Sequence, residues 1–317
     1  MFVTLPSNCM NFYKNKRVFV SGGTGFIGSH LVAALRKTGA KVTAPSRQEA
    51  DLSQADAVKR AIAGHDLVFH LAAAVGGIHY NQAHPAGLLY QNLLPTLNVL
   101  EAARKAKAHR VLIVSSACVY PRFCTVPTPE TEGFKDEPEP SNYGYGWSKR
   151  MAEILAKSYV QEYGMKIGIV RPYNAYGPGD NFDPDRSHVI PALVKKVIDG
   201  ENPLVVWGDG SATRSFIFVS DVVSGMMLAL EKYPVPDPVN LGTTEEISIK
   251  HLAELIIELS GKETKIKFDT KRPNGQPRRN CAVTKAKNFL NFTAKTKLKQ
   301  GLPQVIDYYR NYVQKNS

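Results

Sequence analysis

The sequence predicts an α/β protein built on a Rossmann-type, doubly wound parallel sheet, with a smaller, discontinuous α/β domain beside it. Three observations predict this class. The β-branched run 17–21 is followed by a glycine-rich turn and by an apolar helix that stops at Gly39. Short apolar runs then alternate with helical patterns, which indicates parallel strands with helices on both faces. After Arg171, prolines and glycines break the chain into shorter elements.

The elements of the main sheet follow in chain order. Strands are expected at the apolar runs 17–21, 41–44, 67–71, 111–114 and 167–170. Helices are expected at 27–37, 83–106 and 148–163. The run 216–219 and the helix 221–232 repeat the strand-then-helix order, so we expect them to return to the main sheet. The main domain then comprises residues 16–172 and 213–243, and the second domain comprises residues 173–212 and 244–317.

Composition indicates a soluble globular protein. The chain has 317 residues, of which 43% are hydrophobic and 21% are charged, so it can bury a large core. Its apolar stretches are of strand length, short of the about 20 residues that cross a bilayer, so no membrane span is expected. Residues 1–15 have no positive charge ahead of their apolar residues and no small-residue cleavage pattern, so we expect an extension before the fold rather than a signal peptide.

The four cysteines form neither a Cys-x-x-Cys pair nor a cluster with histidine. This spacing argues against a disulfide framework and against a structural zinc site, so no metal is expected. It also favours a cytoplasmic location. The cysteines are Cys9, Cys118, Cys124 and Cys281.

Positive charge is concentrated near the C-terminus. The net charge is +12, and residues 262–299 hold twelve Lys and Arg against Glu263 and Asp269, a local excess of +10. Such a segment attracts anions. Composition alone leaves three interpretations open: a solvated basic face, a site for a diphosphate, or a surface for nucleic acid.

A glycine pattern marks a candidate dinucleotide site. Gly22, Gly25 and Gly28 lie between a strand and a helix, so the chain can turn tightly and approach a pyrophosphate without a Cβ in the way. Phe26 and Ile27 open the helix, whose N–H groups would point at the same anion. Glycine turns also serve ordinary packing, and the position at the start of a βαβ series is what favours dinucleotide binding.

The end of the second strand bears on the choice of cofactor. A NAD-specific site usually places an acid there for the ribose hydroxyls, whereas this sequence reads Ala44-Pro45-Ser46-Arg47. Arg47 can pair with a 2′-phosphate and Ser46 can donate a hydrogen bond to it, which favours NADP(H), with NAD(H) as the alternative. The other interpretation is that Arg47 simply faces solvent.

Two further segments are expected to line the cofactor. Asp51 and Leu52 are placed for the adenine edge. Leu71, Ala72 and Ala73 follow His70 at a strand end, where small residues let a cofactor lie close.

A serine, a tyrosine and a lysine form the candidate catalytic set. Tyr145 and Lys149 are four residues apart, so both side chains lie on one helix face. Ser116 ends a predicted strand and supplies a hydroxyl. Lys149 would lower the pKa of the tyrosine by its charge, Ser116 would orient a carbonyl, and Tyr145 would exchange a proton as hydride moves. The competing interpretation is a packed tyrosine with a surface lysine.

Together these motifs resemble the extended short-chain dehydrogenase/reductase family, also called the NAD-dependent epimerase/dehydratase family. The likeness covers nearly the whole chain after Lys16. Its motifs are the glycine pattern, 70–73, Ser116, Tyr145-Gly-Trp-Ser-Lys149 and Arg171-Pro-Tyr-Asn-Ala-Tyr-Gly-Pro178. Within the family, five segments are most similar to the GDP-L-fucose synthase group: 75–78, 90–92, 116–121, 180–182 and 187–193. The likeness continues through 206–208, Arg214 and 273–279.

The resemblance implies 3,5-epimerisation and then 4-reduction of GDP-4-keto-6-deoxymannose with NADPH. It implies Cys118 and His188 as the acid and base of epimerisation, although a lone Cys is usually a small buried hydrophobe and a lone His is usually structural. It also implies a homodimer formed by helices 83–106 and 148–163. Cofactor contacts are implied for Lys149 and Tyr173. Substrate contacts are implied for Asn174, His188, Val189, Trp207, Arg214, Arg278 and Arg279.

Other functions stay open at this point. Ser116-Ala117-Cys118 and the Gly-Trp-Ser insert are also similar to GDP-mannose 3,5-epimerase, so a redox-neutral nucleotide-sugar epimerase with bound NAD(P) is the alternative. A non-catalytic NAD(P)-binding regulatory module is disfavoured by the intact Ser/Tyr/Lys set. Diphosphate contacts explain the basic segment better than nucleic acid does, because no aromatic-basic binding motif accompanies it.

Overall fold

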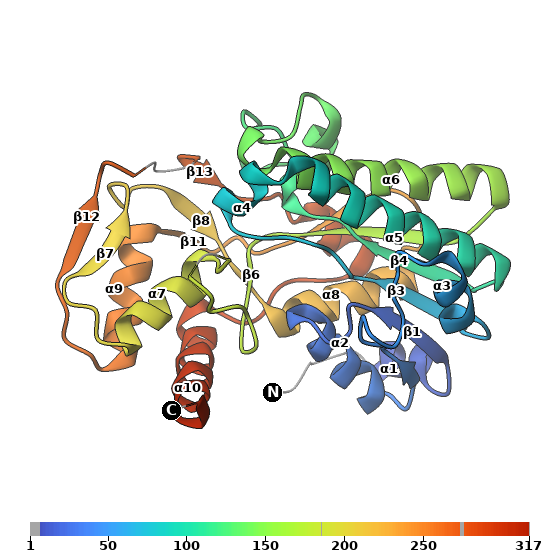
Figure 1. The fold of residues 1–317 in the computed structure, drawn as a ribbon, viewed down its shortest axis with the longest axis horizontal. Coiled ribbons are helices and arrows are strands. Elements are labelled where there is room, and N and C mark those ends of the chain that lie inside the picture. The colour runs from blue at the N-terminus through green and yellow to red at the C-terminus, as the bar shows by residue number, and fades with distance from the viewer. Residues whose placement is uncertain (1–6, 185, 273–275, 317) are drawn as a thin grey trace.

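A six-stranded parallel sheet forms the centre of the protein in the computed structural model, which describes residues 7–184, 186–272 and 276–316 (Figure 1). The strands of this sheet are β1 (Arg17–Ser21), β2 (Lys41–Thr43), β3 (Leu67–His70), β4 (Arg110–Val114), β5 (Ile167–Pro172) and β10 (Val239–Leu241). Their order across the sheet is β10-β5-β4-β3-β1-β2, with every neighbouring pair parallel. The predicted doubly wound parallel sheet is confirmed.

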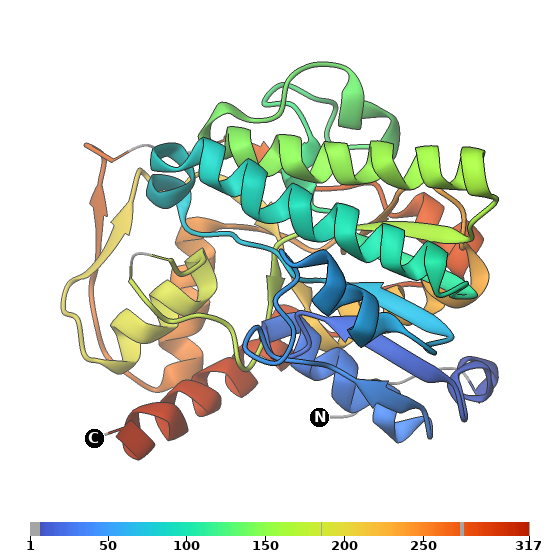
Figure 2. The same ribbon diagram turned by 45° about the vertical axis from the view of Figure 1, so that its right-hand side comes forward.

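Helices cover both faces of this sheet (Figure 2). Helices α1 (Ser7–Tyr13), α2 (Phe26–Lys37) and α8 (Val219–Lys232) pack on one face. Helices α3 (Ala55–Ile62), α5 (Pro85–Lys105) and α6 (Tyr143–Tyr163) pack on the other. The short helices α4 (Ile78–Ala83) and η3 (Pro140–Asn142) pack against each other near the start of α6. Strands enclosed in this way are apolar on both sides, which is why β3 and β4 appear in the sequence as unbroken hydrophobic runs.

The order of the strands creates a switch point between β1 and β3. From β1 the chain crosses to β2 on one side, and β3, β4 and β5 follow on the other. The carboxyl ends of β1 and β3 therefore open a crevice where loops leave in opposite directions, the usual ligand position in such sheets. The glycine turn follows β1, and residues 71–74 follow β3.

The remaining elements form a smaller region with its own hydrophobic core, seen at the left of Figure 1. Its helices are α7 (Val189–Ile198), α9 (Ile249–Ser260) and α10 (Leu298–Asn316). Its strands are β6 (Ala175–Tyr176), β7 (Leu204–Trp207), β8 (Thr213–Ser215), β9 (Ile217–Phe218), β11 (Glu246–Ser248), β12 (Ile266–Asp269) and β13 (Arg278–Arg279). They pair as β11-β8-β13, β12-β7 and β6-β9. The π-helix η4 (Ala286–Leu290) instead packs on α8 and belongs to the core of the main domain.

Two expectations about individual elements were wrong. The run 216–219 does not enter the main sheet: β9 pairs with β6, and β10 is the strand that joins β5. A local apolar run does not specify its partner strand, and β10 is only three residues long. Residues 7–13 are not a loose extension, because α1 packs on α8 with Tyr13 fully buried and its hydroxyl donating to Met227 O at 2.7 Å. In the motif 273–279, residues 273–275 lie outside the described part of the chain. No helix among the described residues combines the length and apolar character of a transmembrane segment.

Candidate active site

The glycine turn after β1 is shaped by close backbone contacts. Gly22 has a φ of +69°, and its carbonyl accepts the Gly25 N–H at 3.1 Å. A Cβ on Gly28 would lie 2.0 Å from Gly22 O, and one on Gly22 would lie 2.7 Å from Ala72 N. Only glycine allows this approach of α2 to the strand ends. Gly25 begins α2 without a side chain over the helix N-terminus, so the residues present fit a dinucleotide pyrophosphate.

The loop after β2 contains a carboxylate that the sequence prediction missed. Glu49 accepts the Ser46 N–H at 2.7 Å, and this hydrogen bond lowers the pKa of Glu49. The Glu49 N–H in turn contacts Ser46 Oγ at 3.4 Å. The spacing Ser-x-x-Glu is a capping-box pattern, which is the signal that could have revealed it. Arg47 is exposed beside this pair.

The other predicted cofactor segments are held by short polar contacts. Asp51 Oδ1 accepts the Ser53 N–H at 2.9 Å, which lowers the pKa of Asp51, and Leu52 O accepts from Asn98 at 2.9 Å. The N–H groups of Leu71 and Ala72 point at Ser21 Oγ, 3.2 and 3.3 Å away. Ala73 is exposed at the same strand end.

Two buried side chains fix the end of β3. His70 bridges Ser21 Oγ at 2.7 Å and Thr96 Oγ1 at 3.1 Å, and burial lowers its pKa to about 3, so this imidazole is neutral. Asn92 of α5 both donates to and accepts from the backbone of Ala74, each at 2.9 Å. Asn92 belongs to a motif segment of the family resemblance, but its role in shaping this crevice was not predicted.

The structure brings the candidate catalytic set together beyond the end of β4. Ser116 begins the 3₁₀ helix η1 (Ala117–Val119), and its Oγ accepts the Cys118 N–H at 3.1 Å and lies close enough to Tyr145 to lower the pKa of that phenol. Lys149 Nζ donates to Val114 O at 2.9 Å and lies 5.6 Å from the centroid of the Tyr145 ring. Burial raises the pKa of Tyr145, against the effect of Ser116, and lowers the pKa of Lys149 to about 8.

Cys118 lies at the same place. Its thiol is within electrostatic range of Tyr145, Lys149 and Arg279. Arg279 is anchored there by its Nη2, which donates to Ala117 O at 2.6 Å. A thiol with two cations and a phenol around it is positioned to exchange protons with a bound ligand.

His188 lies in a separate part of the site. It precedes α7 with 62% of its side chain exposed, and its Nδ1 is 3.7 Å from Oδ1 of the buried Asp180. The Asp180 carboxylate beside it raises the pKa of His188. The other oxygen of Asp180 has no hydrogen-bond partner among the described residues. Within residues 7–184, 186–272 and 276–316, no polar contact joins His188 to Tyr145 or Cys118.

Contacts to the cofactor half hold the loop that carries His188. Pro178 O lies 2.8 Å from His30 Nε2 on α2. The guanidinium of Arg186 lies 5.5 Å from the ring centroid of Tyr80 on α4.

The arginines predicted to bind a diphosphate have different partners. Arg214 and Arg279 are paired in register between β8 and β13, and burial together with the Arg279 charge lowers the pKa of Arg214 to about 10. Arg278 instead forms a two-bond ion pair with Glu246, at 2.8 and 2.9 Å, which lowers the pKa of Glu246 to about 2. Neither Arg214 nor Arg279 forms an ion pair with a carboxylate in the described part of the chain, so the two form a cationic pair that suits an anion.

The remaining predicted contacts are scattered around this centre. Asn174 has a φ of +40° and donates to Ser215 O at 2.8 Å, which joins the two regions. Tyr173 is buried against Tyr120, with ring centroids 5.7 Å apart. Trp207 is 51% exposed with the Arg272 guanidinium 5.1 Å from its ring, and Val189 begins α7.

A cavity of about 540 Å³ adjoins Arg279 on the side of the loop 120–128. Tyr173 and Arg278 also line it. No cluster of metal-binding side chains occurs in the described part of the chain.

Residues 18–242 match the NAD dependent epimerase/dehydratase family. The chain belongs to this family. GDP-L-fucose synthase 1 of Arabidopsis thaliana is 34% identical over 303 residues, which cover 93% of this chain and 94% of that protein. The crystal structure of UDP-glucose 4-epimerase from Thermotoga maritima with UDP-glucose is 27% identical, has a TM-score of 0.85 and covers 94% of this chain and 99% of that one. A GDP-L-fucose synthetase of Naegleria fowleri bound to NADP is 25% identical, with a TM-score of 0.86 and coverage of 95% and 94%.

These similarities confirm the predicted class. The chain is an NAD(P)-dependent enzyme of the epimerase/dehydratase family, and its resemblance to GDP-L-fucose synthases holds over nearly its full length. The roles of individual residues stay predictions.

Proposed function

We propose that this epimerase/dehydratase family member is a 3,5-epimerase and 4-reductase that converts a GDP-4-keto-6-deoxyhexose with NADPH. One observation carries the proposal: Ser116, Cys118, Tyr145 and Lys149 gather with Arg279 at one point beside the crevice. This arrangement offers a proton donor, a hydroxyl, a thiol and cations to a single sugar ring. The similarity to GDP-L-fucose synthases supports the choice of substrate.

In the proposed reduction, Tyr145, Ser116 and Lys149 act on the C4 carbonyl. When bound at the glycine turn, NADPH supplies the hydride that reduces the C4 ketone. Tyr145 donates its proton to the oxygen at C4, and Ser116 hydrogen-bonds that oxygen and fixes its position. The Lys149 ammonium then stabilises the phenolate that remains.

Epimerisation uses the same ketone. A carbonyl at C4 acidifies the hydrogens at C3 and C5, so a base and an acid on opposite sides of the ring can invert both centres. Cys118 and His188 are the candidates, and they lie in different parts of the site. Tyr145 and Ser116 hold the enolate oxygen while the proton is exchanged.

A redox-neutral nucleotide-sugar epimerase is the second candidate. The similarity to UDP-glucose 4-epimerase favours it, and so does Glu49, a carboxylate on the loop that would meet the adenine ribose. Incubation with NADPH and GDP-4-keto-6-deoxymannose distinguishes the two. We expect one NADPH to be consumed for each GDP-6-deoxyhexose formed. Protein that purifies with bound cofactor and inverts a sugar without net consumption of NADPH would refute the reductase.

Cofactor selectivity should depend on Arg47. Arg47→Ala should weaken NADPH binding roughly tenfold or more, because hydrogen bonds to charged groups contribute about 1.5–3 kcal/mol. NADH binding should change by less than about twofold, since NADH has no 2′-phosphate. Fluorescence titration measures both, with Arg60→Ala on α3 as the control, because Arg60 is another exposed arginine. Equal losses for the two cofactors, or wild-type protein that binds NADH at least as tightly as NADPH, would contradict the assignment.

Proton exchange at the sugar should fall as pH rises through the pKa of His188. Asp180 raises the pKa of His188 above its ordinary value, so its acid function extends to higher pH than that of a free imidazole and is lost as pH rises through the raised pKa. Asp180→Asn removes this effect, so the loss should begin at lower pH. The pH profile of solvent-deuterium incorporation measures it, with Asp56→Asn on α3 as the control. An unmoved profile in Asp180→Asn would show that His188 is not the acid.

The family resemblance also leads us to expect a homodimer through α5 and α6. Both helices expose apolar side chains of the kind found at interfaces. They are Tyr90, Leu97, Ile154 and Tyr163. Light scattering tests the expectation. The expected cytoplasmic location is supported by the free thiols of Cys118, Cys124 and Cys281.

A further inference from the structure

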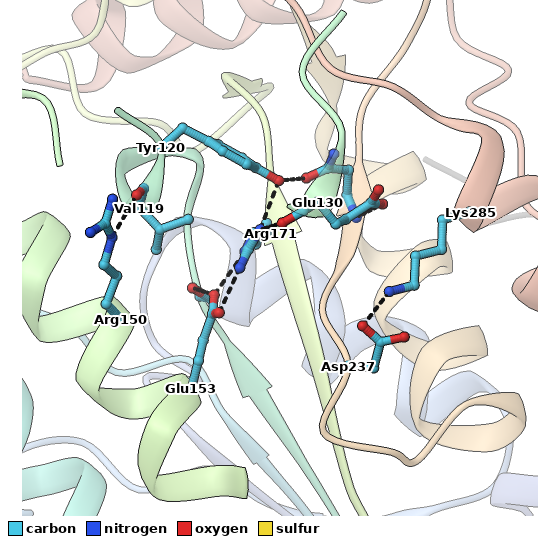
Figure 3. A network of polar contacts seen from close by, with 10 residues as sticks. Val119, Tyr120, Glu130, Arg150, Glu153, Arg171, Asp237 and Lys285 are labelled. Atoms are coloured by element: carbon cyan, nitrogen blue, oxygen red, sulfur yellow. Dashed lines mark hydrogen bonds and ion pairs between the residues drawn. The ribbon is translucent and has the colours of Figure 1, made fainter. Parts of the chain in front are cut away.

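A fully buried ion pair lies behind the catalytic set. Arg171, near the end of β5, is 1% exposed, and Glu153 on α6 is 0% exposed. They meet in a fork: Arg171 Nε donates to Glu153 Oε1 at 2.8 Å and Nη2 donates to Oε2 at 2.7 Å (Figure 3). This bidentate geometry fixes the position of both side chains.

Further hydrogen bonds complete the network. Ser115 Oγ donates to Glu153 Oε1 at 2.6 Å. The remaining Arg171 nitrogen, Nη1, donates to Tyr120 Oη at 2.9 Å and to Glu130 O at 2.8 Å. The pair therefore connects α6, the segment after β4, β5 and the 3₁₀ helix η2 (Glu130–Phe134) (Figure 3).

The far side of the network reaches β10. Tyr120 donates its hydroxyl to Asn240 Oδ1 at 2.5 Å, and the Asn240 N–H donates to Glu130 Oε1 at 2.9 Å. Gly133 lets η2 pack directly on Arg171, because a Cβ there would lie 2.6 Å from Nη2. All three guanidinium nitrogens of Arg171 thus donate hydrogen bonds to protein acceptors.

The network touches the two elements that hold the catalytic residues. On α6, Tyr145, Lys149 and Glu153 are spaced by four and share one face. On the strand side, Ser115 directly precedes Ser116, and Val114 O accepts a hydrogen bond from the Lys149 ammonium. Glu153 lies one helical turn beyond Lys149. Its carboxylate therefore accepts a hydrogen bond from Ser115, the residue next to the catalytic serine.

Stability alone does not account for such a pair. Removing two charges from water costs more than their attraction commonly returns, and well-packed apolar replacements are often as stable or more so. We propose that Glu153 and Arg171 are positioning residues that set the distance between Ser116 and the Tyr145–Lys149 face of α6. The kinetic test of this positioning role rests on the proposed function.

Charge supports the same role. Burial lowers the pKa of Lys149 to about 8, while the Cys118 thiol and the Glu153 carboxylate act in the opposite direction. His70, on β3, also lies within electrostatic range of Lys149 but is neutral at the pH of interest. Glu153 thus helps keep Lys149 protonated in a buried site.

The first variant is Glu153→Gln. We expect kcat to fall roughly tenfold or more with KM within about twofold, because displaced reacting groups slow the chemical step more than binding. The alkaline limb of the kcat profile should also move to lower pH, since Lys149 would lose its proton earlier. Asp66→Asn, which breaks an ion pair with Arg17 at the opposite end of the sheet, is the control and should keep both kcat and the profile.

Two more variants separate positioning from stability. Glu153→Leu combined with Arg171→Met replaces the pair by apolar side chains, so the fold should survive even if the single change unfolds the protein. Positioning predicts that kcat stays low in this double variant. Ser115→Ala keeps the ion pair but removes the hydrogen bond between Glu153 and the segment that carries Ser116. It should also lower kcat and leave KM unchanged. Wild-type kcat and pH profile in a folded double variant would overturn the proposal.

A second measurement does not depend on the substrate. The pKa of Lys149 can be followed by NMR in protein with ¹³C-labelled lysine, with Lys149→Arg to assign the signal. We expect the pKa of Lys149 to fall in Glu153→Gln and to stay in Asp66→Asn. An unchanged value would refute the electrostatic role of Glu153 even if the protein turns over no GDP sugar. A wild-type enzyme inactive on that substrate, with the shift present, would contradict only the proposed function.

Discussion

Tyr145→Phe should lower kcat for NADPH-dependent reduction by about 10²- to 10⁴-fold, the range that a positioned proton donor contributes. The change removes one hydroxyl and keeps the aromatic ring at this position of α6. Ser116 keeps its own hydrogen bond from the Cys118 N–H, so the strand end should retain its shape. NADPH binding should also persist, because the glycine turn is untouched. Stopped-flow measurement of NADPH oxidation, with separate titration of NADPH affinity, tests this expectation.

Tyr143→Phe is the matched control. Tyr143 lies two residues earlier on the same helix, is 42% exposed, and packs its ring near Trp147. It does not share the face of Tyr145 and Lys149, so its loss should leave kcat near the wild-type value. Reduction at an undiminished rate in Tyr145→Phe would show that another group supplies the proton, and the catalytic assignment would then be wrong.

Local patterns predicted much of the main domain. The run 17–21, the glycines after it and the helix that ends before Gly39 form one continuous signal, and the structure has β1, the turn and α2 there. Tyr145 and Lys149 were predicted for the same reason, because residues four apart on a helix share a face. These features depend only on neighbours in sequence, which is what a single sequence reveals.

Features that depend on distant pairing were missed. Glu153 and Arg171 are brought together by the packing of α6 on the sheet. The sequence around either residue does not predict that the other is its partner. Arg278 and Arg279 were predicted as equal partners of a diphosphate. In strand β13 they alternate, so Arg278 pairs with Glu246 while Arg279 lies beside Arg214. That distinction requires knowing that this two-residue segment is a strand.

Cys118→Ser should separate the two half-reactions. A serine hydroxyl is a much weaker base than a thiolate, so solvent-deuterium exchange at C3 and C5 should slow by about 10²-fold or more. Hydride transfer to a 4-keto sugar that already has the inverted configuration should change little, because Ser116, Tyr145 and Lys149 remain. The backbone bond from residue 118 to Ser116 Oγ is also independent of the side chain. Mass spectrometry of deuterium in the sugar and NADPH oxidation measure the two rates on the same protein.

Cys124→Ser tests whether any cysteine change near this loop would have the same effect. Cys124 is also a free, partly buried thiol, and its Sγ contacts Thr128 Oγ1 at 3.4 Å, a contact that serine can replace. It should therefore keep both rates. Equal losses of exchange and hydride transfer in Cys118→Ser would mean that the thiol shapes the site rather than moves protons. The base would then have to be sought among other groups around the sugar, since two inverted centres still require one.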